Sequence, residues 1–348
     1  MNPYVLMILL SSLGLGTTLT FASSHWLLAW MGLEVNTLAI MPLMARHHHP
    51  RAVEATTKYF LTQATAAAMI LFASTTNAWI TGEWDINNMS TPLVNAMIIT
   101  ALALKIGLAP MHFWMPEVLQ GLDLTTGLIL STWQKLAPMA LILQTAQALD
   151  PLLLTSLGFM STLVGGWGGL NQTQLRKMLA YSSIAHLGWM IIVLEYAPQL
   201  TLLTLTVYIF LTSATFLSLK TCSATKINTL AMTWSNSPIL TATTALVLLS
   251  LGGLPPLTGF MPKWLILQEL TKQGLPIVAT IMALAAMLSL YFYLRICYTM
   301  TLTISPNTTN SATPWRVKTT QGSLPLAILT VISLTLLPVT PAIMVLTT

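Results

Sequence analysis

The sequence has very little charge. Asp, Glu, Lys and Arg make up only 7% of its 348 residues, whereas a soluble domain carries about 25%. Hydrophobic residues make up 55% of the chain, so it cannot cover its surface in water with polar side chains. A soluble globular protein is therefore excluded, and long apolar runs predict an all-α, polytopic membrane helix bundle.

Cysteine is also scarce, because Cys222 and Cys297 are the only two. Two cysteines provide neither a disulfide framework nor the spacing of a metal cluster. The three histidines at 47–49 lie between Arg46 and Arg51, whose charges disfavour a cation, and no carboxylate or cysteine completes a ligand set. No Gly-rich nucleotide loop, nucleophile triad or haem motif is present. We therefore expect no metal and no cofactor on this chain, and the lack of a basic block predicts no nucleic-acid partner.

Apolar runs divide the chain into about eleven expected transmembrane helices of roughly 20 residues each. Their expected ranges are 3–21, 25–44, 57–80, 93–120, 125–147, 151–170, 175–195, 199–222, 237–270, 275–299 and 323–346. The ranges 93–120 and 237–270 are too long for one plain crossing and contain internal glycine and proline. Proline removes an amide donor, so Pro110 and Pro255 each free a carbonyl four residues earlier. These two segments are predicted to be broken helices.

The two broken helices lie five spans apart, which predicts two repeats of five helices within a single membrane domain, 1–348. The first repeat is 1–147, the second is 148–300, and helix 323–346 is extra. Because each repeat has an odd number of crossings, the second must be inverted. Broken helices at matching places in inverted repeats are typical of transporters, whose sites lie near the membrane midplane.

Loop charges predict the orientation of the chain. The side that holds the N-terminus receives most basic loop residues: Arg46, Arg51, Lys58, Arg176, Lys177, Lys220, Lys226, Arg316 and Lys318. The other side receives Glu83, Asp85, Asp150 and Glu195, with Lys272 as its one basic loop residue. The positive-inside rule then places the N-terminus inside and the C-terminus outside.

Four charged residues, Glu34, Lys105, Lys135 and Lys263, fall inside or beside apolar spans. A charge near the bilayer centre costs roughly 3 kcal/mol on insertion scales, so it is rarely kept without a function. Burial disfavours the charged form and an opposite charge nearby favours it, so a Glu–Lys pair whose separation changes can load and unload a proton. The alternative is that the lysines form fixed ion pairs or extend to the interface. With two broken helices present, the set favours a pathway for protons or ions.

Two histidines add groups that titrate near neutral pH. His112 lies in the first broken helix, and His186 lies in the span 175–195 near Ser182 and Ser183, which can order water. A membrane histidine more often makes a hydrogen bond between helices. Both are candidate proton relays, and that role requires a position between the lysines.

Three segments resemble motifs of a known family. Lys105-x-Gly-x-Ala-Pro-x-His112-x-Trp-x-Pro-Glu117 is similar to the broken-helix motif of the antiporter-like subunits of respiratory complex I. The segments 176–188 and 253–263 resemble two further motifs of that family, which also includes cation/proton antiporters. The resemblance narrows to a member encoded in animal mitochondria. The features that narrow it are the opening Met-Asn-Pro, the segment 25–34 and the short length.

The resemblance implies a number of helices and a set of proton-pumping residues that composition alone does not show. Family members usually have fourteen helices, and the animal member lacks the first three, which fits eleven. The family assigns proton pumping to a Glu–Lys pair, here Glu34 with Lys105, to the central Lys135 and to the exit-side Lys263, with His186 as a bridging histidine.

The resemblance also implies the mitochondrial inner membrane, with the N-terminus in the matrix and the C-terminus in the intermembrane space. Flavin, iron–sulfur clusters and quinone then belong to other complex I subunits, which are the implied partners together with supernumerary subunits and lipids such as cardiolipin. The implied function couples NADH:ubiquinone electron transfer to proton pumping, without a redox centre on this chain.

The motifs leave two alternatives open. A stand-alone cation/proton antiporter carries the same motifs, but no cluster of cation-coordinating carboxylates is evident. A structural membrane scaffold does not explain four charges at membrane depth.

Overall fold

The computed structural model describes residues 2–46, 48–89, 91–146, 150–302 and 323–347. As predicted, the described part of the chain is helical, and its only β pairing is two isolated bridges. The chain divides into two compact units, Met1–Ser161 (unit 1) and Thr162–Thr348 (unit 2), and the division falls within a helix.

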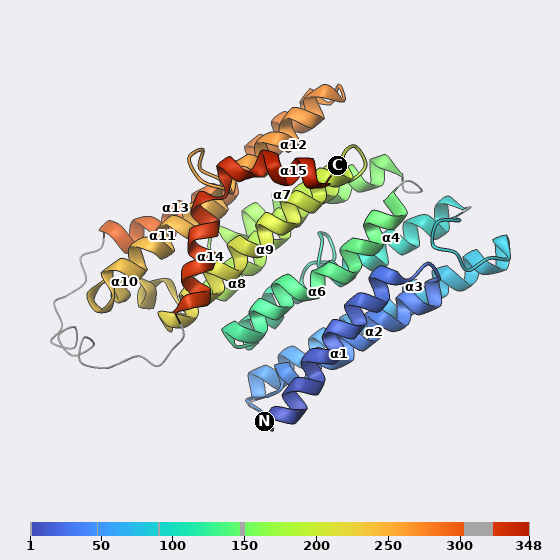
Figure 1. Cartoon of the computed structure of the whole chain (residues 1–348), viewed down its shortest axis with the longest axis horizontal. Helices are drawn as coiled ribbons and strands as arrows, with labels where there is room; N and C mark the ends of the chain where they lie inside the picture. Colours follow the sequence, from blue (N-terminus) through green and yellow to red (C-terminus); the bar gives the residue numbers. More distant parts are fainter. Residues whose placement is uncertain (1, 47, 90, 147–149, 303–322, 348) are drawn as a thin grey trace. The chain divides into compact units, whose positions relative to one another are not determined.

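The described residues of unit 1 form six complete helices. Figure 1 labels them α1 to α6 except α5. They are α1 (Pro3–Ala22), α2 (Trp26–Met44), α3 (Pro50–Thr81), α4 (Pro92–Ile106), α5 (Trp114–Gly121) and α6 (Leu124–Thr145). Helix α3 packs against α2, α4 and α5, and α6 packs against α1, α2 and α4. Proline in the first turn begins α1, α3 and α4, where its missing N–H has no partner to lose.

Helices α1 and α2 approach each other through two glycines. A Cβ on Gly16 would lie 2.9 Å from the Gly32 carbonyl oxygen, and a Cβ on Gly32 would lie 2.9 Å from that of Gly16. Small residues at such a crossing bring the backbones close, which is the usual way that membrane helices gain packing contacts.

Unit 2 contains the remaining helices, and α7 (Pro151–Gly169) crosses the division between the units. They are α8 (Leu175–Val193), α9 (Pro198–Thr221), α10 (Ile227–Asn236), α11 (Pro238–Gly252), α12 (Phe260–Lys272), α13 (Pro276–Leu302), α14 (Leu324–Thr335), the 3-10 turn η4 (Leu337–Val339) and α15 (Thr340–Thr347). Helix α9 packs against α8, α11, α12 and α14, and α13 packs against α10, α11 and α12.

Two features of unit 2 differ from the sequence prediction. Helix α10 was not expected. The expected single helix 323–346 is bent by 65° between α14 and the segment after it. Pro338 explains the bend, because a proline cannot donate to the carbonyl four residues before it and its ring clashes there.

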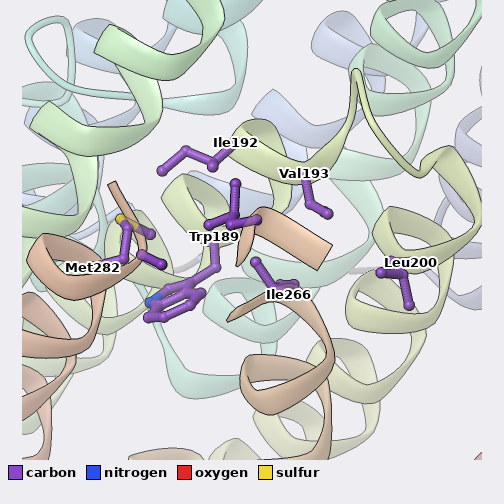
Figure 2. Close-up of a cluster of buried hydrophobic side chains, with 8 residues drawn as sticks. Trp189, Ile192, Val193, Leu200, Ile266 and Met282 are labelled. Atoms are coloured by element: carbon purple, nitrogen blue, oxygen red, sulfur yellow. The ribbon is translucent and has the colours of Figure 1, made fainter. Parts of the chain in front are cut away.

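A hydrophobic cluster joins four helices of unit 2 (Figure 2). Trp189, Ile192 and Val193 come from α8 and Leu200 from α9. Ile266 and Leu270 come from α12, and Ala279 and Met282 from α13. The cluster therefore fixes the rotation of α12 against its neighbours.

Each of the eleven expected spans contains helix, and the two predicted breaks occur between α4 and α5 and between α11 and α12. Within the described ranges, five helices are individually long and apolar enough to cross a membrane, namely α1, α2, α7, α9 and α13, and the bent C-terminal pair is a sixth candidate. The count of eleven crossings and the orientation stay predictions. Arg316 and Lys318, which entered the charge comparison, lie outside the described residues.

The two breaks begin with the same backbone geometry. Gly107 ends α4 with φ 86° and ψ 43°, and Gly253 ends α11 with φ 85° and ψ 45°. The backbone amides of Gly107 and Leu108 both donate to the carbonyl oxygen of Ala103. Those of Gly253 and Leu254 both donate to the carbonyl oxygen of Leu249. Positive φ costs glycine little, and this pattern is the usual way in which a helix ends on glycine.

A second feature recurs in the two units. In unit 1 an isolated antiparallel bridge joins His25, before α2, to Asp85, after α3. In unit 2 an equivalent bridge joins Gln174, before α8, to Lys226, after α9. The order of helices around each bridge and each break matches, with α2, α3, α4 and α5 corresponding to α8, α9, α11 and α12; α10 is an addition.

Candidate functional site

Lys105 and Lys135 line one internal cavity of unit 1. Its volume is about 10 Å³, which is near the minimum needed to hold one water molecule. Asn36 and Thr37 of α2, Tyr59 and Gln63 of α3, Trp114 of α5 and Gln134 of α6 also line it. The cavity therefore joins the two predicted lysines through polar side chains of five helices.

The apolar face of α4 places the side chain of Lys105 in the interior of unit 1. Ile98, Leu102 and Lys105 are spaced by four and three residues, so they share one side of α4, and all are buried. The Nζ atom has no hydrogen-bond partner among the described residues, and one carboxylate oxygen of Glu34 is likewise buried without one. Glu34 lies close enough to Lys105 for the two groups to interact electrostatically.

Lys135 is only 3% exposed and lies in the middle of α6. Met139 and Ile142 follow it at spacings of four and seven residues and are buried as well. One face of α6 therefore carries an ammonium group into the interior, next to Gln134, which also lines the cavity.

The break after α4 leaves backbone carbonyls that side chains satisfy. The indole Nε1 of Trp114 donates to the carbonyl of Leu104 at 3.0 Å, and the amide of Gln63 donates to the carbonyl of Lys105 at 3.4 Å. His112 lies in the turn between α4 and α5, where its Nδ1 is 3.3 Å from the carbonyl of Pro110. His112 is buried, but it lies outside the lining of the lysine cavity.

Unit 2 has a separate cavity of about 20 Å³ that His186 and Lys263 line together. Tyr208 of α9 also lines it, and its ring centre lies 5.6 Å from that of His186. Lys263 precedes Ile266 and Leu270 on one side of α12, so the hydrophobic cluster of Figure 2 holds the lysine toward the interior. The structure thus places His186 and Lys263 on the lining of one cavity.

Lys263 also caps the second break. Its Nζ donates to the carbonyl oxygen of Gly252 at 2.8 Å, at the last residue of α11. A cation near the C-terminal end of a helix is favourable, because the free carbonyls there carry partial negative charge. Lys263 therefore has a structural role besides any role in proton transfer.

Two groups of residues were missed by the sequence reasoning. Asn36 and Gln134 were not singled out, although both line the lysine cavity; their positions only two residues after Glu34 and one before Lys135 were the available signal. The second group is at the surface, where Lys58 contacts both Glu54 and Glu117 at 2.7 Å. The contact between Lys58 and Glu117 ties α5 to α3.

Glu117 occupies the place in the first break that Lys263 occupies in the second. Counting from Gly107 and from Gly253, each is the eleventh residue, and prolines occur at the fourth and tenth positions of both segments. The lysine of the first break instead lies before the glycine. The two broken helices therefore share the glycine that begins the break and the proline spacing, but they place their charges differently.

Among the described residues, no three His, Cys, Asp or Glu side chains gather in a way that could hold a metal ion. What the described residues offer is a set of buried or half-buried amine, carboxylate and imidazole groups beside small cavities. Such groups can bind and release protons.

Comparisons with known proteins identify the family of this chain. The family described as "NADH:quinone oxidoreductase/Mrp antiporter, TM" matches residues 23–289, and the family described as "NADH dehydrogenase subunit 2 C-terminus" matches residues 290–344. NADH-ubiquinone oxidoreductase chain 2 of Carassius auratus is 82% identical over 100% of both chains, and that of Danio rerio is 76% identical over 100% of both.

Solved structures show the same fold. A chain in the respiratory complex I of Thermus thermophilus with bound aureothin has a TM-score of 0.86 and 28% identity, and the match covers 99% of this chain and 80% of that one. A chain of the Mrp complex from Dietzia sp. DQ12-45-1b has a TM-score of 0.85 at 16% identity, covering 97% and 76%, which shows the fold alone.

The fold and its broken helices define a membrane protein of antiporter type. The chain belongs to the NADH:quinone oxidoreductase/Mrp antiporter family and, within it, to the NADH-ubiquinone oxidoreductase chain 2 proteins. The resemblance drawn from the three motifs is thereby confirmed.

Proposed function

We propose that this chain is the proton-translocating, antiporter-like membrane subunit 2 of respiratory complex I, which couples NADH:ubiquinone electron transfer to proton pumping. The observation that carries the proposal is the cavity shared by Lys105 and Lys135, with Glu34 beside Lys105. The 82% identity to an NADH-ubiquinone oxidoreductase chain 2 over the whole chain supports the assignment to that complex.

The chemistry follows from charge in a medium of low polarity. A buried ammonium is stable beside a carboxylate and less stable alone. When Glu34 pairs with Lys105, the proton on that lysine is held; when the carboxylate turns away, the proton is released toward the cavity and Lys135. In unit 2, His186 and Lys263 face a common cavity and extend the same type of exchange.

The placement of the protein follows from its family. We place it in the mitochondrial inner membrane with the N-terminus in the matrix, supported by the excess of basic loop residues on that side. Its partners are the other membrane subunits of complex I, and lipids such as cardiolipin cover the remaining surface. The flavin, the iron–sulfur clusters and the quinone belong to other subunits. The matching bridges and breaks of the two units support the two predicted repeats.

The test is proton translocation per NADH oxidised in vesicles that contain the assembled complex. Lys135→Met should lower that ratio while NADH oxidation and assembly persist, because methionine fills the site but binds no proton. Lys272→Met is the matched control, since Lys272 is exposed and pairs with Glu269 near the end of α12. An unchanged ratio in Lys135→Met with intact complex would refute the central role of that lysine.

A stand-alone cation/proton antiporter is the alternative function, and it predicts a different result. An antiporter reconstituted alone would exchange Na⁺ or K⁺ for H⁺. We expect no such exchange from this chain without its complex, and its appearance in purified single-chain vesicles would favour the antiporter.

A further inference from the structure

Asn36 is a buried amide whose side chain has no explained role. It is 2% exposed, and both Oδ1 and Nδ2 are buried without a hydrogen-bond partner among the described residues. A buried amide without partners is unfavourable, and buried polar groups of this kind are normally satisfied by protein or ordered water. Asn36 therefore points to a ligand that can both accept and donate hydrogen bonds.

The surroundings of Asn36 fit a water molecule. The residue lines the cavity of about 10 Å³ that Lys105 and Lys135 share, and the Nζ of Lys105 is also buried without a hydrogen-bond partner among the described residues. A buried water needs about this much room and two to four polar partners. The carboxamide supplies an acceptor and two donors, and a lysine supplies a further donor or, when neutral, an acceptor.

Two neighbours hold Asn36 in place. The side-chain amide of Gln134 donates to the backbone carbonyl of Asn36 at 3.3 Å, which ties α2 to α6 beside Lys135. On the other side, Gly16 of α1 leaves the space that the carboxamide occupies, because a Cβ there would come within 2.8 Å of Cγ of Asn36. The side chain is therefore confined between α1 and the cavity.

We propose that Asn36 holds a water molecule between Lys105 and Lys135 and positions it for proton transfer between the two lysines. This inference rests on the proposed function and deepens it. The water accepts a proton from the ammonium of one lysine and gives a different proton to the neutral amine of the other, so one proton moves and no electron changes place. Asn36 is a positioning residue that orients the water and exchanges no proton itself.

The experiment compares three variants of the assembled complex in vesicles, with proton translocation per NADH as the measurement. Asn36→Leu keeps the volume but removes both polar atoms, and should lose the same part of proton translocation that Lys135→Met loses. Asn36→Ser restores a polar group and leaves room for a second water, so it should retain translocation. Asn95→Leu makes the same chemical change at a buried asparagine of α4 outside the cavity lining, and should also retain it.

Two outcomes in the assembled complex would overturn the inference, and a third case calls for a separate measurement. If Asn36→Leu translocates protons like the wild type while Lys135→Met does not, the water position is wrong and the proposed function stands. If Asn36→Ser loses as much as Asn36→Leu in an assembled complex, the effect is one of packing. If Asn36→Leu does not assemble, a high-resolution map of the wild-type complex decides: water density about 3 Å from the carboxamide supports the inference, and its absence among well-defined side chains overturns it.

Discussion

The glycine that ends α11 offers a sharp test of how the second break controls Lys263. Gly253 has φ 85°, so any other L-residue there is strained by about 1–2 kcal/mol. A Cβ on Gly253 would also lie 2.9 Å from Nζ and 3.1 Å from Cδ of Lys263. Gly253→Ala must therefore push the ammonium group away from the Gly252 carbonyl, and a hydrogen bond to a charged group contributes about 1.5–3 kcal/mol.

A glycine between α12 and α13 supplies the matched control. Gly274 has φ 74°, so Gly274→Ala carries a similar backbone strain. No described heavy atom lies within 4 Å of a Cβ at this position. The difference between the two variants thus separates the displacement of Lys263 from the cost of the backbone strain.

Two measurements follow for the pair of variants. The assembled complex should lose activity faster on heating in both variants. The increase should be larger in Gly253→Ala, because this variant also loses a hydrogen bond to a charged group, worth up to about 3 kcal/mol. Proton translocation per NADH should fall in Gly253→Ala and stay near the wild-type value in Gly274→Ala. Equal translocation in the two variants would refute the view that the Gly252–Lys263 contact positions the lysine.

Two further predictions concern unit 1. Gly16→Ala should lower the yield of assembled complex, because its Cβ would meet Asn36 and the Gly32 carbonyl. Gly14→Ala is the control and should not lower the yield, because nothing lies within 4 Å of its Cβ. Equal yields on a native gel would contradict the close packing of α1 on α2. Glu117→Gln should leave proton translocation and assembly unchanged, because Lys58 is 43% exposed, Glu117 is 53% exposed, and water and salt screen exposed ion pairs. A loss of translocation in Glu117→Gln would instead place this surface pair on the proton path.

The broken helices show what local sequence can predict. Proline and glycine act on the backbone within a few residues, so the breaks could be placed from 93–120 and 237–270 without any tertiary information. Helix α10 was missed because it directly precedes an apolar run, and its ten residues are too few to stand out as a span. The bend at Pro338 was missed because the apolar run 323–346 was treated as a single span despite that proline.

Scarcity of charge was enough to define a helical membrane protein, because apolar runs of this length have no other stable environment. The same scarcity marked Glu34, Lys105, Lys135 and Lys263, because each charge among apolar residues stands out. The sequence could not say which of these groups meet. Only the tertiary structure placed Lys105 with Lys135, placed Lys263 with His186 and left His112 outside the lysine cavity. It also added Asn36 to the cavity. The physical reason is that a cavity is made by side chains from helices far apart in the chain, and their rotation and close approach depend on packing that no local pattern records.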